Sequence, residues 1–321
     1  MKSPLPSILI LTLFLVPASA AYSNEPNSAP NEAANPHGTI LELFDLTEDR
    51  LRTALANAKT DEERMTLHEQ LGGILIAQKA GQSAITQFEA AADLAARIGD
   101  ATNEFRLRNL IGNTYLQMNN QSDAVIAFEH ARQVSYDAQI STSDRFMIRK
   151  KLGIVHFSLS NFAQAADCSL EASMHIPSTA HRELLQTFYI MGLSYARIGQ
   201  TQKARQYLQG SMRQFNLLHE SSQNAKITIF PSPLLALAVL EAGLGNKKTA
   251  LAHLRDARKI LTAFQAKKAD PITAEQQKLL ATHKTRTKFM LTLTEDWIAK
   301  IKSGAKLEWD DFKHQGAKRS G

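Results

Sequence analysis

Residues 111–131 read IGNTYLQMNNQSDAVIAFEHA, and residues 71–91 read LGGILIAQKAGQSAITQFEAA. Both stretches have a large residue before a glycine, a large residue three positions later, and then Ala-x-x-x-Phe-x-x-Ala. The matching residues are Ile111, Gly112, Tyr115, Ala124, Phe128 and Ala131 in one stretch, and Leu71, Gly72, Leu75, Ala84, Phe88 and Ala91 in the other. Spacings of three and four place side chains on one helix face. Each stretch therefore predicts two helices that cross closely at their small residues.

Three looser copies of this pattern follow. The small residue that anchors each copy is Gly72, Gly112, Gly153, Gly192 or Ala238, so successive anchors lie 40, 41, 39 and 46 residues apart. The extra length of the last step lies around residues 223–233, which end in Pro231 and Pro233. A unit with one apolar face must stack on its neighbours to bury that face. The spacing therefore predicts an all-α array of about five antiparallel helix pairs.

The turns inside the copies also have a pattern. Gly199 in copy four and Gly245 in copy five are suited to a helix C-cap. In copy two the turn is Asn119–Asn120, and Ser122 is expected to cap the helix that follows.

This pattern resembles the tetratricopeptide repeat family over residues 60–264. The resemblance implies a right-handed solenoid in which the first helix of each pair lines a concave, protein-binding face. Two features depart from the family: the repeat is longer than the usual length of about 34 residues, and Arg108 and His68 replace the usual aromatic residue. The two-carboxylate clamp of chaperone-binding members does not transfer, because Glu69 and Gly73 occupy its first two positions.

Both ends of the array are expected to be capped. Residues 38–59 are either an N-terminal capping helix or a degenerate repeat, and Asp45 and Thr47 are expected to divide them into two short helices. Thr60 and Glu63 form a capping box that opens the first repeat.

At the other end, a helix is expected within residues 265–303, opened by a second capping box at residues 273–276. Its apolar contacts are expected to be Leu279, Leu280, Met290, Leu291 and Trp297. Residues 304–321 form a basic tail in which Trp309 and Phe312 either fold back on the array or dock on a partner.

The first twenty residues are typical of a secretory signal peptide. Lys2 precedes an apolar run at residues 8–16, and Ala18-Ser19-Ala20 suits signal peptidase. Residues 21–37 form a polar linker that is expected to be disordered. These features predict an exported protein, soluble in the bacterial periplasm or outside the cell after cleavage.

Cys168 is the only cysteine, which excludes an intramolecular disulfide framework. It lies in a second helix, where cysteine is most often a small buried hydrophobic residue, and the alternative is a reactive thiol. Exported chains without disulfides fit a bacterial periplasm or surface better than a eukaryotic secreted module.

Charge is distributed unevenly along the chain. Residues 21–245 hold 19 Lys and Arg against 23 Asp and Glu, a net charge of −4, whereas residues 246–321 hold 17 against 8, a net charge of +9. The basic region either caps the array as a solvated surface or contacts an anionic membrane or wall polymer. Export and the acidic array disfavour nucleic-acid binding.

Residues on the first helices that are not used for stacking are expected to face the concave groove and bind a partner. They are Arg106, Asn109 and Asn113 in copy two, Lys150, Ile154 and Phe157 in copy three, and Tyr189 and Arg197 in copy four. Amide and guanidinium groups suit the backbone and carboxylates of an extended peptide.

No motif in the chain indicates catalysis. The ten histidines show no metal-ligand spacing, and the chain has no phosphate-binding loop and no nucleophile elbow. We therefore predict no cofactor, no metal and no enzymatic activity. The expected function is a non-catalytic peptide- or protein-binding scaffold of the cell envelope. The alternatives are a structural protein held on an anionic surface by its basic C-terminal region and, less favoured, a hydrolase.

Overall fold

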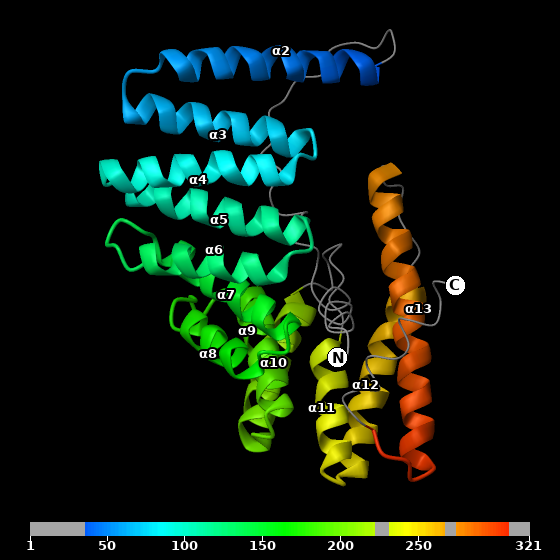
Figure 1. Cartoon of the computed structure of the whole chain (residues 1–321). Helices are drawn as coiled ribbons and strands as arrows, with labels where there is room; N and C mark the ends of the chain where they lie inside the picture. The colour runs from blue at the N-terminus through cyan, green and yellow to red at the C-terminus, as the bar shows by residue number, and fades with distance from the viewer. Residues whose placement is uncertain (1–35, 222–230, 267–273, 308–321) are drawn as a thin grey trace, which may run out of the picture. The chain divides into compact units, whose positions relative to one another are not determined.

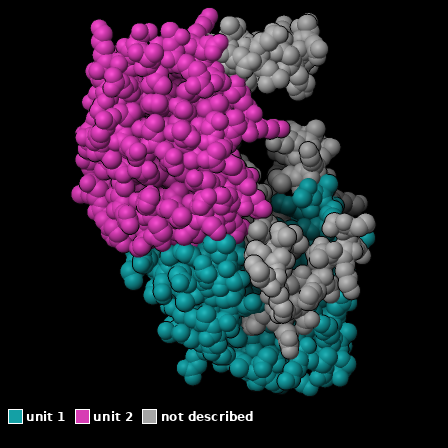
Figure 2. Space-filling view, viewed as in Figure 1, with its two compact units in different colours: residues 1–20, 156–321 teal, residues 21–155 magenta. Residues whose placement is uncertain are grey.

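The computed structural model describes residues 36–221, 231–266 and 274–307, and these residues form twelve α-helices and no strand. The helices are α2 (Pro36–Asn57), α3 (Asp61–Ala77), α4 (Gly81–Ile98), α5 (Ala101–Gln117), α6 (Gln121–Val134), α7 (Thr142–Ser158), α8 (Phe162–Ser173), α9 (His181–Arg197), α10 (Thr201–Ser221), α11 (Ser232–Gly243), α12 (Lys247–Ala266) and α13 (Ala274–Lys302). The predicted all-α architecture of helix pairs is confirmed. The chain divides into two compact units, with unit 2 ending at Val155 and unit 1 continuing from His156 (Figure 2).

In unit 2 each helix from α2 to α5 packs against the next along the chain, and α2 to α6 lie as successive layers (Figure 1). The core is built from the predicted signature residues. Leu71, Leu75, Ala84, Phe88, Ala91 and Ile111 all belong to one buried cluster that includes residues of α3, α4, α5 and α6. Stacking therefore buries the faces that a single helix pair would leave exposed.

The anchor glycines are the points where the two helices of a pair cross. A methyl group added at Gly72 would overlap the ring of Phe88, and one at Gly112 would overlap the ring of Phe128. In unit 1 the methyl group would meet Leu208 at Gly192. The large residue of the second helix thus occupies the space that a side chain would take, which explains why the two residues recur together in the sequence.

The turn between the helices of a pair repeats the same backbone conformation in all five copies. The residue seven positions after each anchor has a positive φ, at Lys79 (62°), Asn119 (59°), Ser160 (65°), Gly199 (79°) and Gly245 (80°). The predicted glycine caps in copies four and five are confirmed. The first three copies make the same turn with residues that carry a side chain, for which the left-handed conformation costs energy that glycine does not lose.

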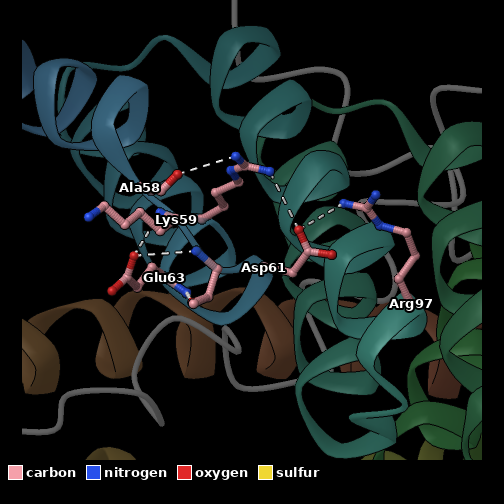
Figure 3. Close-up of polar contacts among 7 residues, drawn as sticks. Ala58, Lys59, Asp61, Glu63 and Arg97 are labelled. Carbon is pink, nitrogen blue, oxygen red and sulfur yellow. Dashed lines mark hydrogen bonds and ion pairs between the residues drawn. The ribbon is translucent and has the colours of Figure 1, made fainter.

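The capping box that opens α3 is confirmed. Thr60 Oγ1 accepts from Glu63 N at 3.1 Å, and the Glu63 carboxylate accepts from the backbone N of Lys59 and Thr60 (Figure 3). The Asp61 carboxylate forms ion pairs with Arg64 of the same helix and with Arg97 of α4, so it links the start of α3 to α4.

Two predictions about helix ends were wrong. Asn120, not Ser122, caps α6, because the Asn120 side chain accepts from Asp123 N. The segment before α3 is a single helix, α2, without a break at Asp45 or Thr47.

In unit 1 the helices again pack in chain order from α8 to α13. A buried cluster joins α11, α12 and α13 through residues such as Leu235, Leu254 and Trp297. The buried carboxylate of Glu241 occupies a signature position and pairs with Arg205, with Nε and Oε1 2.6 Å apart. The segment to which the extra length of the last step was assigned lies, up to residue 230, outside the described residues, and α10 is itself longer, at 21 residues, than its counterparts α4 with 18 and α6 with 14.

Helix α13 agrees with the expected C-terminal helix. Met290 and Trp297 are buried, and Leu291 packs beside the same cluster. The structure does not describe the signal peptide, the linker as far as residue 35, or the part of the tail after Leu307, which holds Trp309 and Phe312. The side chains of the capping box at residues 273–276 and of Leu279 and Leu280 also lie outside the described part of the chain. None of the described helices combines the length and the apolar character needed to cross a bilayer.

Candidate functional site

Two asparagines and a lysine from neighbouring repeats meet on one face of unit 2. Lys151 Nζ, from α7, donates to Asn109 Oδ1 at 2.7 Å and to Asn113 Oδ1 at 2.9 Å. The two asparagines lie one turn apart on α5, so their amides share a face of the helix. Arg106 precedes them on the same face and binds Glu69 of α3. We refer to these five residues as the polar face.

The lysine fixes the orientation of both amides. An ammonium group can only donate hydrogen bonds, so each asparagine must turn its oxygen toward Nζ. The two NH2 groups then point away from Lys151, and the half-buried side chains keep part of their surface accessible. The pair therefore presents donors, which suit a carbonyl or carboxylate oxygen.

Lys151 lies in an unusual environment for a cation. Burial, together with the neighbouring charge of Lys150, lowers the pKa of its ammonium to about 8. Its Nζ also lies 5.4 Å from the centre of the Phe128 ring, where a cation–π contact offsets some of the lost hydration. Within the described part of the chain, no carboxylate contributes to the shift, so the amide oxygens provide its main polar contacts.

The guanidinium of Arg106 is already used inside the protein. Two of its nitrogens bind the two oxygens of the Glu69 carboxylate, and it also donates to Asn103 Oδ1 at 2.9 Å. The hydrogen bonds to Glu69 raise the pKa of the Arg106 guanidinium. Arg106 was predicted to bind a partner directly, but the structure uses it to hold α5 against α3.

The prediction for copy three needs one correction and one addition. Lys150 was expected to face the groove, and its ammonium lies 5.6 Å from the centre of the Phe146 ring, whereas the asparagines are bound by Lys151, which was not predicted. Phe157 was expected to face the groove, but it is buried and packs edge-on against Phe162 with ring centres 5.3 Å apart. Ile154 is partly buried.

The residues predicted in copy four belong to unit 1. Tyr189 is buried, and burial raises the pKa of its phenol, so it is a core residue rather than a groove residue. Arg197 lies at the end of α9, with its guanidinium carbon 4.8 Å from the centre of the Phe162 ring.

Sequence reasoning missed Lys151 and the structural role of Glu69. Lys150 and Lys151 differ by about 100° around α7, and the repeat alignment placed Lys150 opposite Asn109. The signal that could have found the contact is the need of a half-buried lysine for oxygen partners on the preceding repeat. Cys168 is buried, as its position in a second helix predicted.

Comparisons with known proteins agree with the repeat pattern. Residues 63–136 match the model of the tetratricopeptide repeat family. A comparison with curated proteins finds no match. Among solved structures, the chain is similar to BtubC from P. vanneervenii, with 12% identity, coverage of 75% of this chain and 97% of the other, and a TM-score of 0.54. It is also similar to apo RapI, with 14% identity, coverage of 83% and 82%, and a TM-score of 0.56. Identities this low show a shared fold.

Proposed function

Because the chain is a tetratricopeptide-repeat array, we propose that it is a non-catalytic scaffold that binds a protein or peptide along the polar face of unit 2. The single observation that supports this assignment most strongly is the Lys151-oriented pair of amides at Asn109 and Asn113. Two donors held one helical turn apart are suited to the backbone oxygens of an extended segment.

The neighbouring contacts support the same assignment. The Glu69–Arg106 pair fixes α3 against α5, so the asparagines sit on a rigid support and lose little conformational entropy on binding. The Lys151 ammonium beside the amides is held by both asparagine oxygens, so the donors keep one orientation that suits binding.

The proposal can be tested by crosslinking in cells followed by pull-down of the full chain. We expect wild type to capture a defined partner and Asn109→Ala/Asn113→Ala to lose it. Gln133→Ala is the matched control, since Gln133 is an exposed amide residue on α6 that takes no part in the polar face. Both variants should unfold at the wild-type temperature if the change acts on binding alone.

The same partners recovered with the double variant and with wild type would contradict the role of the polar face. A second variant, Lys151→Met, sharpens the result because it leaves both amides in place but removes the group that orients them. We expect it to weaken capture, and less so than removal of the amides.

We also propose that the protein acts outside the cytoplasm, on the basis of the signal-like segment at residues 1–20. N-terminal sequencing of the protein recovered from fractionated cells tests this. A mature chain that starts near Ala21 in the envelope fraction is the expected result, and an intact Met1 in the cytoplasmic fraction would contradict it.

A second candidate function rests on α12, where exposed basic side chains outnumber acidic ones. Lys247, Lys248, Arg255, Arg258 and Lys259 are exposed, against the single exposed carboxylate of Asp256. Such a helix is suited to an anionic lipid or wall polymer. Binding to anionic vesicles that falls steeply with added salt would favour this function, whereas capture by the polar face should persist.

A further inference from the structure

Unit 2 also carries a pocket on the side of α5 that faces away from the polar face. It has a volume of about 160 Å3 and is lined by Glu89, Arg108, Ile111, Tyr115, Asp123, Ile126, Ala127 and His130. On α5, Ile111 and Tyr115 lie one turn apart, and helical periodicity places them about 160° around the axis from Asn109 and Asn113. A ligand in this Tyr115 pocket would therefore not compete for the proposed peptide site.

The same place in copy four is filled by the protein itself. When Gly112 is aligned with Gly192, Tyr115 corresponds to Tyr195. The ring of Tyr207 stacks on Tyr195 with centres 5.4 Å apart and planes at 15°. The ammonium of Lys203 lies 5.1 Å from the centre of the Tyr195 ring. Copy four thus places an aromatic ring and a cation against its tyrosine.

Copy two lacks both of these groups. The same alignment places Ala127 where copy four has Tyr207, and Asp123 where it has Lys203. The small alanine leaves the space that forms the pocket, and the cation is replaced by a carboxylate. The ring of Tyr115 is therefore a wall of an open pocket, where its counterpart is a covered core residue.

The charges around this pocket favour a cation. Burial raises the pKa of the Tyr115 phenol, and the negative charges of Glu89 and Asp123 raise it further, so both carboxylates act on its hydroxyl. Asp123 accepts from the neutral amide of Asn120, and no ion pair among the described residues offsets Glu89 or Asp123.

Arg108 also lines the pocket, but its positive charge is matched by other carboxylates. Its NH2 group donates to Asp93 Oδ1 at 2.8 Å, and its Nε lies 3.8 Å from Glu104 Oε1. The two carboxylates that also line the pocket, Glu89 and Asp123, therefore give its wall an acidic character.

We propose that the Tyr115 pocket binds one arginine or lysine side chain of a partner protein. Its methylene groups would contact Ile111 and Ala127, and its cationic end would lie against Tyr115 between the carboxylates of Glu89 and Asp123. The volume favours a single side chain over a drug-sized ligand, since pockets for the latter usually exceed about 300 Å3. In copy four the Lys203 ammonium lies against the corresponding tyrosine, so we expect the group that binds in the Tyr115 pocket to be a cation as well.

The test uses methyl-labelled isoleucine in the full chain, because Ile111 and Ile126 line the pocket. The protein is titrated by NMR with N-acetyl-arginine methylamide, N-acetyl-lysine methylamide and, as an acidic control, N-acetyl-glutamate methylamide. We expect saturable shifts at these two residues with the basic probes only. In Glu89→Gln/Asp123→Asn the affinity should fall about tenfold or more, since two charge-assisted hydrogen bonds are lost.

Two further variants make the test specific to this pocket. Asp49→Asn/Glu62→Gln removes the same charge at exposed sites of unit 2 and should keep wild-type binding. Asp123→Lys/Ala127→Tyr copies the filled arrangement of copy four and should abolish it. Should that variant fail to fold, the reverse change, Lys203→Asp/Tyr207→Ala, should create a second site near Tyr195.

Three results would overturn the proposal. They are an absence of shifts at Ile111 and Ile126, equal affinity in wild type and in Glu89→Gln/Asp123→Asn, and tighter binding of putrescine than of the blocked arginine. The last result would assign the pocket to a free amine instead of a protein side chain. Failure of this test leaves the polar face unaffected, because capture there depends on different residues.

Discussion

Copies two and four share one packing scheme and differ on both of their exposed sides. Each has an anchor glycine, Gly112 or Gly192, pressed against a large residue of the second helix. On one side, copy two carries Asn109 and Asn113 where copy four carries the buried residues Tyr189 and Leu193. On the other side, copy two has an open pocket where Tyr207 and Lys203 cover Tyr195.

Packing and recognition are thus carried by separate residues of the same repeat. Residues between the two helices of a pair are interchangeable only with others of similar size, because neighbouring atoms fill the space. Residues on the two outward sides vary freely as long as polar groups find partners or water. A repeat can therefore gain or lose a binding site without a change of fold.

The largest effect should come from the packing that the two copies share. Phe128→Ala removes the ring that covers Gly112 and should cost about 3–5 kcal/mol of unfolding free energy. Leu208→Ala in copy four should cost about 2–5 kcal/mol for the same reason. Denaturant unfolding of both variants checks this. Substitutions at exposed sites usually change stability by less than about 1 kcal/mol. A loss below this value in Phe128→Ala would contradict the packing of Phe128 against Gly112.

The next effect concerns Lys151, the half-buried lysine of the polar face. Since its pKa falls from 10.5 to about 8 on folding, the unfolded chain binds more protons between these values, and stability should rise with pH through this range. The shift corresponds to at most roughly 3 kcal/mol. Unfolding should be measured at pH 7 to 10.5 in wild type, Lys151→Met and the exposed control Lys248→Met. A rise that persists in Lys151→Met would assign it to another group.

A smaller effect should follow from enlarging the anchor. Gly112→Leu forces a side chain into the space of the Phe128 ring and should cost about 1–3 kcal/mol. Combined with Phe128→Ala, the loss should be less than the sum of the two single losses, since the added side chain enters the space that the ring left. The thermal midpoint of the three proteins checks this, and full additivity would mean that the two residues are not in contact.

The smallest effect lies in the turn. Gly199→Ala places a side chain at a φ of 79° and should cost about 1–2 kcal/mol. Asn119→Gly in copy two should change stability by only about 0.3 kcal/mol, because asparagine tolerates the left-handed region. If Asn119→Gly lost as much stability as Gly199→Ala, the left-handed φ would not be what sets the cost at these two turns.

Much of the fold could be predicted because the same spacing of small and large residues recurs five times along the chain. The spacing of Gly72, Gly112 and Gly192 predicted the helix crossings, and Thr60 with Glu63 predicted the start of α3. Local errors occurred where two residues could cap one helix, as with Asn120 and Ser122. The site was predicted less well. Asn109 and Asn113 were identified as a pair, but Lys151, which binds both, was missed, and Phe157 and Tyr189 proved to be buried.

The sequence alone determined the helix pairs, their crossings and their turns, because these depend on residue size and spacing within one repeat. Which side chains remain accessible depends on the neighbouring repeats, so it became evident only from the folded array. Arg106 is engaged by Glu69 of the preceding repeat, the amides of Asn109 and Asn113 are oriented by Lys151 of the following one, and the pocket at Tyr115 is open because Ala127 does not fill it. Contacts between repeats are not encoded in any single copy of the pattern.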